Sequence, residues 1–149
     1  MILKKLILKD QNPILITNLP EDLYEIHRYL ANNHEIHHQA IRGIKYEFAV
    51  SFVLTTNDVK WVADKVIPSL EKDAIFWVVY PKKTTKKYKS EISRDKGWEP
   101  IGELGYEGVS MIAIDNDWSA FRFRHVDYIK SITRSAKIAI TKEGKSKSH

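Results

Sequence analysis

The chain has 149 residues, of which 43% are hydrophobic and 29% are charged, and it contains no cysteine. This composition is that of a folded globular protein, and it excludes disulfide scaffolds, thiolate chemistry, collagen-like chains and largely disordered chains. We expect a single domain over residues 1–140 and a disordered basic tail over residues 141–149. Lysines interrupt the apolar start of the chain, and no later apolar run approaches the roughly 18 residues of a membrane helix. We therefore expect a cytoplasmic protein with no membrane partner.

The formal net charge of +5 has a single main origin in the sequence. Seven basic and two acidic residues lie between positions 82 and 96, whereas the rest of the chain carries equal numbers of each sign. Attraction to a polyanion is therefore expected from this segment, with a further contribution from the lysines of the tail.

The first half of the chain predicts strands that alternate with helices. The segment ILIT at residues 14–17 predicts a short buried strand, and Pro20 followed by acidic residues predicts the start of a helix. A weaker strand is expected at residues 36–41 and a strongly apolar strand at residues 46–54. The apolar side chains that follow Asn57 recur at helical spacing, which predicts the clearest helix of the chain.

The next part of the chain predicts a further strand and a helix. Residues 74–80 are continuously apolar, as in a strand with both faces buried. Residues 86–95 predict a helix that Thr85 caps and Gly97 ends.

The last part of the chain predicts a hairpin. Strands are expected at residues 109–115 and 119–124, joined by a turn at Asn116 and Asp117, and a helix is expected over residues 126–135. Strands that alternate with helices predict a parallel sheet covered on both sides. The predicted fold is therefore a three-layer, Rossmann-like α/β fold with a mostly parallel sheet and a C-terminal antiparallel hairpin.

A terminal hairpin after a parallel α/β unit is similar to the later half of S-adenosylmethionine-dependent methyltransferases of the Rossmann-like type. The cofactor of that family requires a glycine-rich turn after the first strand, because only glycine lets the backbone approach the ligand closely. Here residues 17–21 read TNLPE, and no glycine precedes Gly43. The resemblance therefore implies a reduced methyltransferase fold without its cofactor loop, and we expect no bound cofactor.

Four strings in the second half of the chain carry another resemblance. They read YPK, KKYKSEISRDKGW, LGYEGVSMIAIDNDWSAFRFR and YIKSITR. They resemble a bacterial family of short proteins that share a domain of unknown function. That family brings no established activity, so the resemblance implies a fold and assigns no catalytic residue.

The basic segment interleaves positive charge with aromatic rings, which is what phosphate contacts combined with base stacking need. The candidate residues are Lys82, Lys83, Lys86, Lys87, Tyr88, Lys89, Arg94 and Trp98. They predict binding of an anionic ligand or a nucleic acid. The alternative is that the lysines lie on a solvated surface and only keep the protein soluble, with Trp98 in the core.

A second candidate site lies where the parallel strands end, because ligands of open α/β sheets bind beyond the carboxyl ends of the strands. The candidates there are Asn18, Thr55, Tyr80, Asp115, Asp117 and Trp118, with Lys82 beside them. They predict a small polar ligand, with the lysine meeting an anion and an aspartate acting as acceptor or base. The alternative is structural: the asparagines at positions 18 and 57 cap helices, Asp117 shapes a turn, and Trp118 packs over the end of the sheet.

Residues 34–38 read HEIHH and match the H-E-x-x-H pattern of zinc hydrolases, which requires both histidines on one turn of a helix. Two asparagines precede the pattern and no apolar helical stripe surrounds it, so we expect an extended segment. An extended segment would place His34 and His38 about 13 Å apart, too far for one metal ion. We expect no metal site here.

The sequence favours a non-enzymatic binding or regulatory module that acts through residues 82–98 or through a protein interface. The alternative is an enzyme that acts on a small molecule in the polar cleft, with Lys82 and either Asp115 or Asp117 as its polar groups. A flat edge beside basic residues would favour binding, and a deep cleft with converging ionisable groups would favour catalysis. The sequence does not indicate the oligomeric state.

Overall fold

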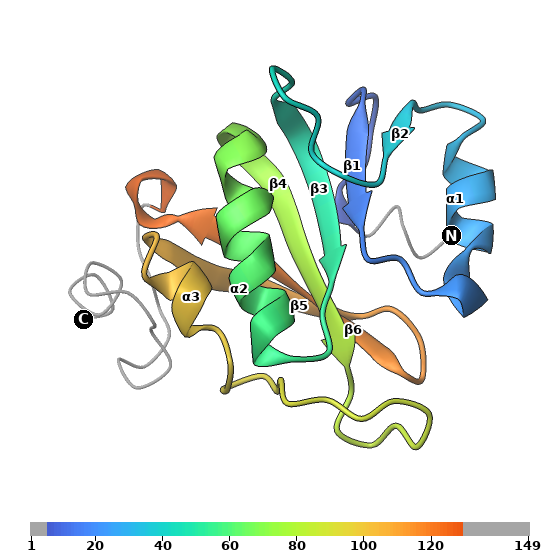
Figure 1. The fold of residues 1–149 in the computed structure, drawn as a ribbon, viewed down its shortest axis with the longest axis vertical. Helices are drawn as coiled ribbons and strands as arrows, with labels where there is room; N and C mark the ends of the chain where they lie inside the picture. Colours follow the sequence, from blue (N-terminus) through green and yellow to red (C-terminus); the bar gives the residue numbers. More distant parts are fainter. Residues whose placement is uncertain (1–5, 130–149) are drawn as a thin grey trace.

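The computed structural model describes residues 6–129, which form a mixed α/β structure around a six-stranded sheet (Figure 1). The strands are β1 (Ile14–Thr17), β2 (Ile36–His37), β3 (Tyr46–Phe52), β4 (Leu70–Pro81), β5 (Tyr106–Ala113) and β6 (Trp118–His125). The helices are α1 (Glu25–Leu30), α2 (Thr56–Lys65) and α3 (Glu99–Gly102), with 3-10 turns η2 (Glu21–Leu23), η3 (Ile67–Ser69) and η4 (Val126–Tyr128). Within these residues, no helix combines the length and the apolar character that crossing a bilayer requires.

The sheet has the strand order β2-β1-β3-β4-β6-β5. The first four strands in this order run parallel, and β6 is antiparallel to both of its neighbours. The last strand is thus inserted between β4 and β5, and it forms a hairpin with β5 through the turn at residues 114–117. The predicted α/β fold is confirmed, with its mostly parallel, Rossmann-like sheet and its C-terminal antiparallel hairpin.

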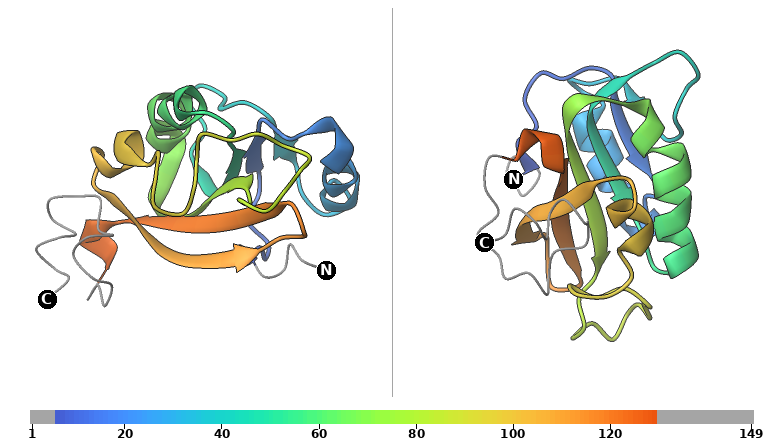
Figure 2. Two further views of the ribbon diagram at one scale, coloured as in Figure 1. Left: turned by 90° about the horizontal axis from the view of Figure 1, so that it is seen from below. Right: turned by 90° about the vertical axis from the view of Figure 1, so that its left-hand side faces the viewer.

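Each face of the sheet has its own core, which is why the central strands read as continuous apolar runs. On one face, α2 and α3 pack over side chains that include Phe76 and Phe123, and Figure 2 shows these two helices on the same side of the sheet. On the other face, Leu30 of α1 and Leu6 belong to a cluster around Trp77. The indole N–H of Trp77 donates to the carbonyl oxygen of Leu6 at 2.8 Å. Both faces are therefore covered, as the predicted three-layer arrangement requires.

The clearest predicted helix, α2, begins slightly earlier than the sequence suggested. Its N-cap is Thr55, whose side chain accepts the N–H of Asp58 at 3.0 Å. The carboxylate of Asp58 in return accepts the N–H of Thr55 at 3.1 Å, which completes a capping box. The expected cap at Asn57 is therefore wrong, because the threonine two residues earlier satisfies the free N–H groups.

The helix predicted over residues 86–95 is wrong. Residues 82–98 form a long loop with no helix in it. The segment has no apolar stripe at helical spacing, and its two largely apolar side chains separate: Ile92 packs into the core beneath α2, whereas Tyr88 packs against the core of the opposite face. A single helix could not place them in both positions.

Smaller differences concern the ends of elements. The strand expected at residues 36–41 is only two residues long, and the first predicted helix is divided into η2 and α1. The short helix α3 was not predicted. Of the helix expected over residues 126–135, the described part is η4, and its remainder and the predicted tail at residues 141–149 lie outside the described residues.

Candidate functional site

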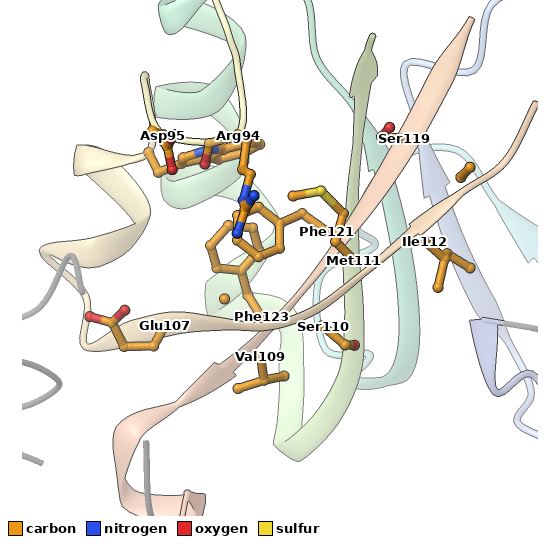
Figure 3. Close-up of a pocket in the computed structure, with 13 residues that line it drawn as sticks. Arg94, Asp95, Glu107, Val109, Ser110, Met111, Ile112, Ser119, Phe121 and Phe123 are labelled. Carbon is orange, nitrogen blue, oxygen red and sulfur yellow. The ribbon is translucent and has the colours of Figure 1, made fainter. Parts of the chain in front are cut away.

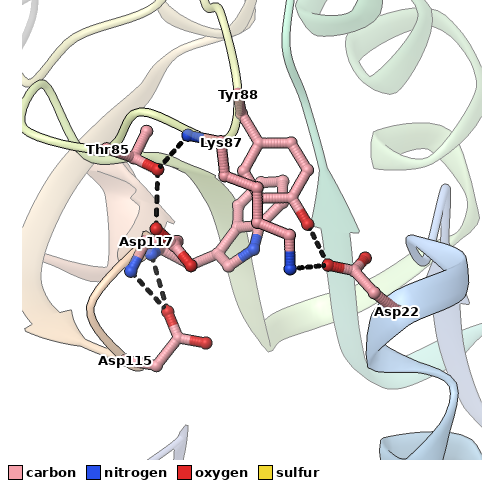
Figure 4. Close-up of polar contacts among 7 residues, drawn as sticks. Asp22, Thr85, Lys87, Tyr88, Asp115 and Asp117 are labelled. Atoms are coloured by element: carbon pink, nitrogen blue, oxygen red, sulfur yellow. Dashed lines mark hydrogen bonds and ion pairs between the residues drawn. The ribbon is translucent and has the colours of Figure 1, made fainter.

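The carboxyl ends of β1, β3 and β4 meet at one edge of the sheet, and the loop after β4 runs along this edge. We call residues 82–92 the strap. It begins directly after β4 and returns to the end of β3, where the N–H of Glu91 donates to the carbonyl of Leu54 at 2.9 Å. Figure 4 shows that side chains of the strap connect the loop after β1 with the turn of the terminal hairpin. The strap therefore lies across the edge at which open α/β sheets bind ligands.

Asp22 holds the strap to the loop after β1. The hydroxyl of Tyr88 donates to Asp22 Oδ2, and Lys87 Nζ lies 2.6 Å from the same oxygen. The hydrogen bond from Lys87 lowers the pKa of Asp22, and Asp22 in turn raises the pKa of Lys87. Burial and the bond to Asp22 both raise the pKa of Tyr88. At neutral pH the three groups are therefore an aspartate, an ammonium and a neutral phenol.

The turn of the hairpin holds the strap at a second point. The hydroxyl of Thr85 donates to Asp117 Oδ1 at 2.6 Å, and the backbone N–H of Lys82 donates to the Asp117 carbonyl at 2.7 Å. The ring of Tyr88 packs on the indole of Trp118, with 4.6 Å between ring centroids. Asp115 accepts the N–H groups of the two residues that follow Asn116, at 2.8 Å each. Asp115 thereby shapes its own turn, as aspartates commonly do.

Glu91 holds the far end of the strap to α2. Its Oε1 accepts the N–H of Thr56 at 2.8 Å and the hydroxyl of Thr56 at 3.2 Å. The hydroxyl of Ser90 donates to the carbonyl of Leu54 at 3.1 Å. An N–H in the first turn of a helix has no partner inside the helix, so the carboxylate of Glu91 acts as a second cap beside Thr55.

The structure does not gather all of the predicted cleft residues around one space. It brings Asp115, Asp117 and Trp118 together with the strap, but Tyr80 and Trp118 belong to cores on opposite faces of the sheet and are 4% and 1% exposed. Asn18 is an exposed residue with a φ of 60° in the loop after β1, and the following η2 begins after Pro20 instead. Most polar groups at this edge are bound to one another or to a helix end.

The H-E-x-x-H segment has no helical turn. Ile36–His37 form the short strand β2, and the two outer histidines have different partners. His34 Nδ1 lies 2.8 Å from the carbonyl of Gln11, and His38 Nδ1 lies 2.9 Å from the carbonyl of Ile16. In the part of the chain that the structure describes, no three side chains of metal-binding type come together.

The lysines and the aromatic rings of the basic segment lie in different environments. Lys83, Lys86 and Lys89 are exposed, and their side chains pair with no residue in the range 6–129. Trp98 is only 2% exposed and contacts the rings of Tyr80 and Phe123, among others. Its indole is therefore a core group, and we leave it out of any surface that stacks on bases.

Charge is segregated between the strap and the body of the structure. The strap holds five lysines and one glutamate, whereas the rest of residues 6–129 carries 11 basic and 17 acidic side chains. The strap is thus a basic band on an acidic body, and carboxylates of that body, Asp22 and Asp117, are among the groups that hold it.

A pocket of about 490 Å³ lies away from this edge, between the β5–β6 hairpin and the turn at residues 93–98 (Figure 3). Its lining includes Arg94, Asp95, Trp98, Met111, Phe121 and Phe123. The sequence pointed to Arg94 and Trp98 only as parts of the basic segment. The missed signal was Gly108, because a glycine inside a strand often marks a close approach of another group.

No protein-family model and no curated protein sequence matches this chain. Among solved structures, it is similar to the fibrillarin pre-rRNA processing protein of Methanococcus jannaschii, with a TM-score of 0.49 and 12% sequence identity. The alignment covers 78% of this chain and 66% of the fibrillarin chain, just under two thirds of its length. At this level of similarity the comparison assigns neither activity nor partner, and the bacterial family suggested by the sequence strings stays a hypothesis.

Proposed function

We propose that this protein is a non-enzymatic binding module that contacts a polyanion, most simply single-stranded nucleic acid, through the lysines of the strap. One observation carries the proposal: the strap is attached through Tyr88, Thr85 and Glu91, whereas the ammonium groups of Lys83, Lys86 and Lys89 point to water without a partner among the described residues. A segment that is held in place yet keeps its lysines free is suited to contacting phosphates.

The arrangement of the carboxyl edge supports a binding role over catalysis. Asp117 accepts the hydroxyl of Thr85, Asp115 shapes its turn, and Thr55 caps α2. Groups engaged in this way are not available as an acid, a base or a nucleophile without rearrangement. The residues after β1 also lack a glycine turn, and the strap lies across this edge, so both features favour a protein that does without S-adenosylmethionine.

The proposed contact depends on charge and not on base stacking. Trp98 and Tyr80 are in the core, and Tyr88 is engaged with Trp118 and Asp22. Binding through phosphates alone is independent of base sequence and strongly dependent on salt. We therefore expect weak selectivity among single-stranded sequences of equal length.

The test is a salt titration of fluorescence anisotropy with a labelled single-stranded oligonucleotide. The triple variant Lys83→Gln, Lys86→Gln, Lys89→Gln removes three phosphate contacts, so the slope of log K against log salt should become shallower by about 2, at about 0.7 per contact. The matched control replaces Lys60, Lys65 and Lys72 with glutamine, which removes the same charge from exposed positions outside the strap.

The control variant should bind as the wild type does. Equal weakening in both variants would show that net charge and not the strap attracts the oligonucleotide, and it would contradict the proposal. Failure of the wild type to bind the oligonucleotide at low ionic strength would also contradict the proposal.

A further inference from the structure

The pocket beside the terminal hairpin has the size of a small-molecule site. Its volume of about 490 Å³ is within the range of ligand pockets in proteins, and its lining is mostly apolar and aromatic. Figure 3 shows side chains of the hairpin and of the turn at residues 93–98 pointing toward this space from two sides. The pocket lies on the face that α2 and α3 cover, separate from the strap contacts at Asp22.

The floor of the pocket depends on Gly108. A Cβ at this position would lie 2.2 Å from the ring of Phe121, so only a residue without a side chain lets that ring lie against the backbone of β5. Met111 is paired with Phe121 across the two strands, and Met111 Sδ accepts the hydroxyl of Tyr80 at 3.3 Å. The floor therefore consists of the Phe121 ring, which packs on the backbone at Gly108, and the Met111 thioether, which is bonded to Tyr80.

The opposite wall is a turn with a fixed backbone. Ser93 and Lys96 exchange two backbone hydrogen bonds, of 3.1 and 3.3 Å. The indole N–H of Trp98 donates to the carbonyls of Ser93 and Arg94 at 2.9 and 3.1 Å, which ties the turn to the core. Gly97 has a φ of 102°, in the left-handed region that glycine adopts without strain. The tip of the turn, Arg94, is thereby held over the pocket.

The lining holds two carboxylates, Asp95 and Glu107, and one basic residue, Arg94, whose charge the fold leaves unpaired among the described residues. Its side chain is exposed, and it has no ion pair or side-chain hydrogen bond within residues 6–129, although Asp95 is its neighbour in sequence. Figure 3 shows its guanidinium directed toward the ring of Phe121 and away from the carboxylate of Asp95. Burial raises the pKa of Tyr80, while the charge of Arg94 acts in the opposite direction. The positive charge of Arg94 therefore reaches the Tyr80 hydroxyl that bonds Met111 at the pocket floor.

We propose that this pocket binds a planar aromatic molecule that carries an acidic group, with its ring system against Phe121 and Met111 and its acid on the guanidinium of Arg94. Aromatic and thioether surfaces favour a flat ring, and a free guanidinium forms paired hydrogen bonds with a carboxylate, sulfonate or phosphate. The site is independent of the strap lysines, and it assigns the protein a small ligand in addition to a polyanion.

The test uses two fluorescent probes with the full-length protein. Anilinonaphthalene sulfonate carries an acid on an aromatic system, and N-phenyl-1-naphthylamine is its neutral counterpart. We expect the anionic probe to bind at one site and more tightly than the neutral one. Replacing Arg94 with glutamine should weaken the anionic probe about three- to tenfold, the effect of losing a partly exposed charged hydrogen bond, and leave the neutral probe unchanged.

Lys96→Gln is the matched control, because it removes one positive charge from the same turn at a residue that does not line the pocket. It should leave the affinity for both probes unchanged. Equal weakening by Lys96→Gln and Arg94→Gln would show that the anionic probe responds to the general charge of the loop, and it would overturn the proposal.

A second variant tests the pocket itself. Gly108→Ala pushes the ring of Phe121 toward the cavity, so both probes should bind at least several-fold more weakly, while a thermal melt confirms that the variant is folded. If this variant does not fold, Met111→Trp fills the same space from a side chain that is 36% exposed, and it should have the same effect. Absence of saturable binding to the wild type, or unchanged binding in the filled-pocket variant, would overturn the proposal.

Discussion

The two parts of the 82–98 loop differ in how they contact the rest of the structure. The strap lies across the carboxyl edge of the parallel strands, and its polar groups bind Asp22, Asp117 and Thr56. The turn at residues 93–98 stands beside the antiparallel hairpin and leaves a pocket with Arg94 at its rim. The usual ligand edge of an open α/β sheet is thus covered by the chain's own residues, and the open space lies where two antiparallel strands leave the parallel part of the sheet.

This difference shows that sheet topology does not by itself decide where a ligand binds. The rule for open α/β sheets identifies the carboxyl edge because loops there usually leave a crevice. Here the strap lies across that edge, and a glycine in the edge strand β5 makes room for the Phe121 ring beside the pocket. We therefore expect the residues that fix the turn to contribute most to the free energy of unfolding, and the residues that attach the strap to contribute least.

The largest effect is expected from Trp98→Ala. Trp98 is 2% exposed and holds the turn through its indole N–H, so its truncation should lower the free energy of unfolding by about 3–5 kcal/mol, measured by urea denaturation. Trp61→Ala is the control, because Trp61 is 37% exposed, and it should cost about 1 kcal/mol or less. Equal losses in the two variants would contradict the core role of Trp98.

An intermediate effect is expected from Thr55→Ala. Since Thr55 caps α2 in a capping box, the loss should be about 1 kcal/mol in the free energy of unfolding. Thr55→Ser keeps the hydroxyl and should retain most of that stability. If Thr55→Ala were as stable as the wild type, Thr55 would again be a candidate for a ligand contact at the carboxyl edge.

The smallest effect is expected from Asp22→Asn, which removes the charge that holds the strap. At pH 7 the loss should be less than about 1 kcal/mol, because the pair is solvent-exposed. The pKa of Asp22 is lowered from 3.8 in the folded state, so its contribution is complete above pH 3.8 and is lost as the pH falls through the folded value. The difference between Asp22→Asn and the wild type should therefore shrink in acid, as urea denaturation at several pH values would show. A constant difference across that range would mean that Asp22 acts through packing and not through charge.

The sequence predicted the elements whose partners are close in sequence or whose pattern is strong. The strand β1 was predicted with its observed bounds, because three consecutive apolar residues followed by a β-branched threonine favour a buried strand. The turn between β5 and β6 was predicted from Asn116 and Asp117, which are typical turn residues. The arrangement of strands with a terminal hairpin followed from these patterns.

The candidate site was harder to predict, because its contacts join distant parts of the chain. Tyr88 and Asp22 are 66 positions apart, and Thr85 and Asp117 are 32 positions apart, so no local pattern indicates that a lysine-rich segment is tied down and not helical. The role of Gly108 depends on how the Phe121 ring lies across the neighbouring strand, which sequence does not give. The sequence showed where the positive charge lies. It did not show that the lysines of this segment are exposed whereas the ring of Trp98 is buried.

The packing of Tyr88 on Trp118 gives the strap its own spectroscopic reporter. Trp118 is 1% exposed while the strap is in place, so we expect its indole to emit as a group shielded from water. Departure of the strap would uncover this indole and shift its emission to longer wavelength, whereas Trp77 stays bonded to Leu6 on the same face and serves as an internal reference. The natural fluorescence of the protein can therefore distinguish a polyanion that lies on a closed strap from one that lifts it.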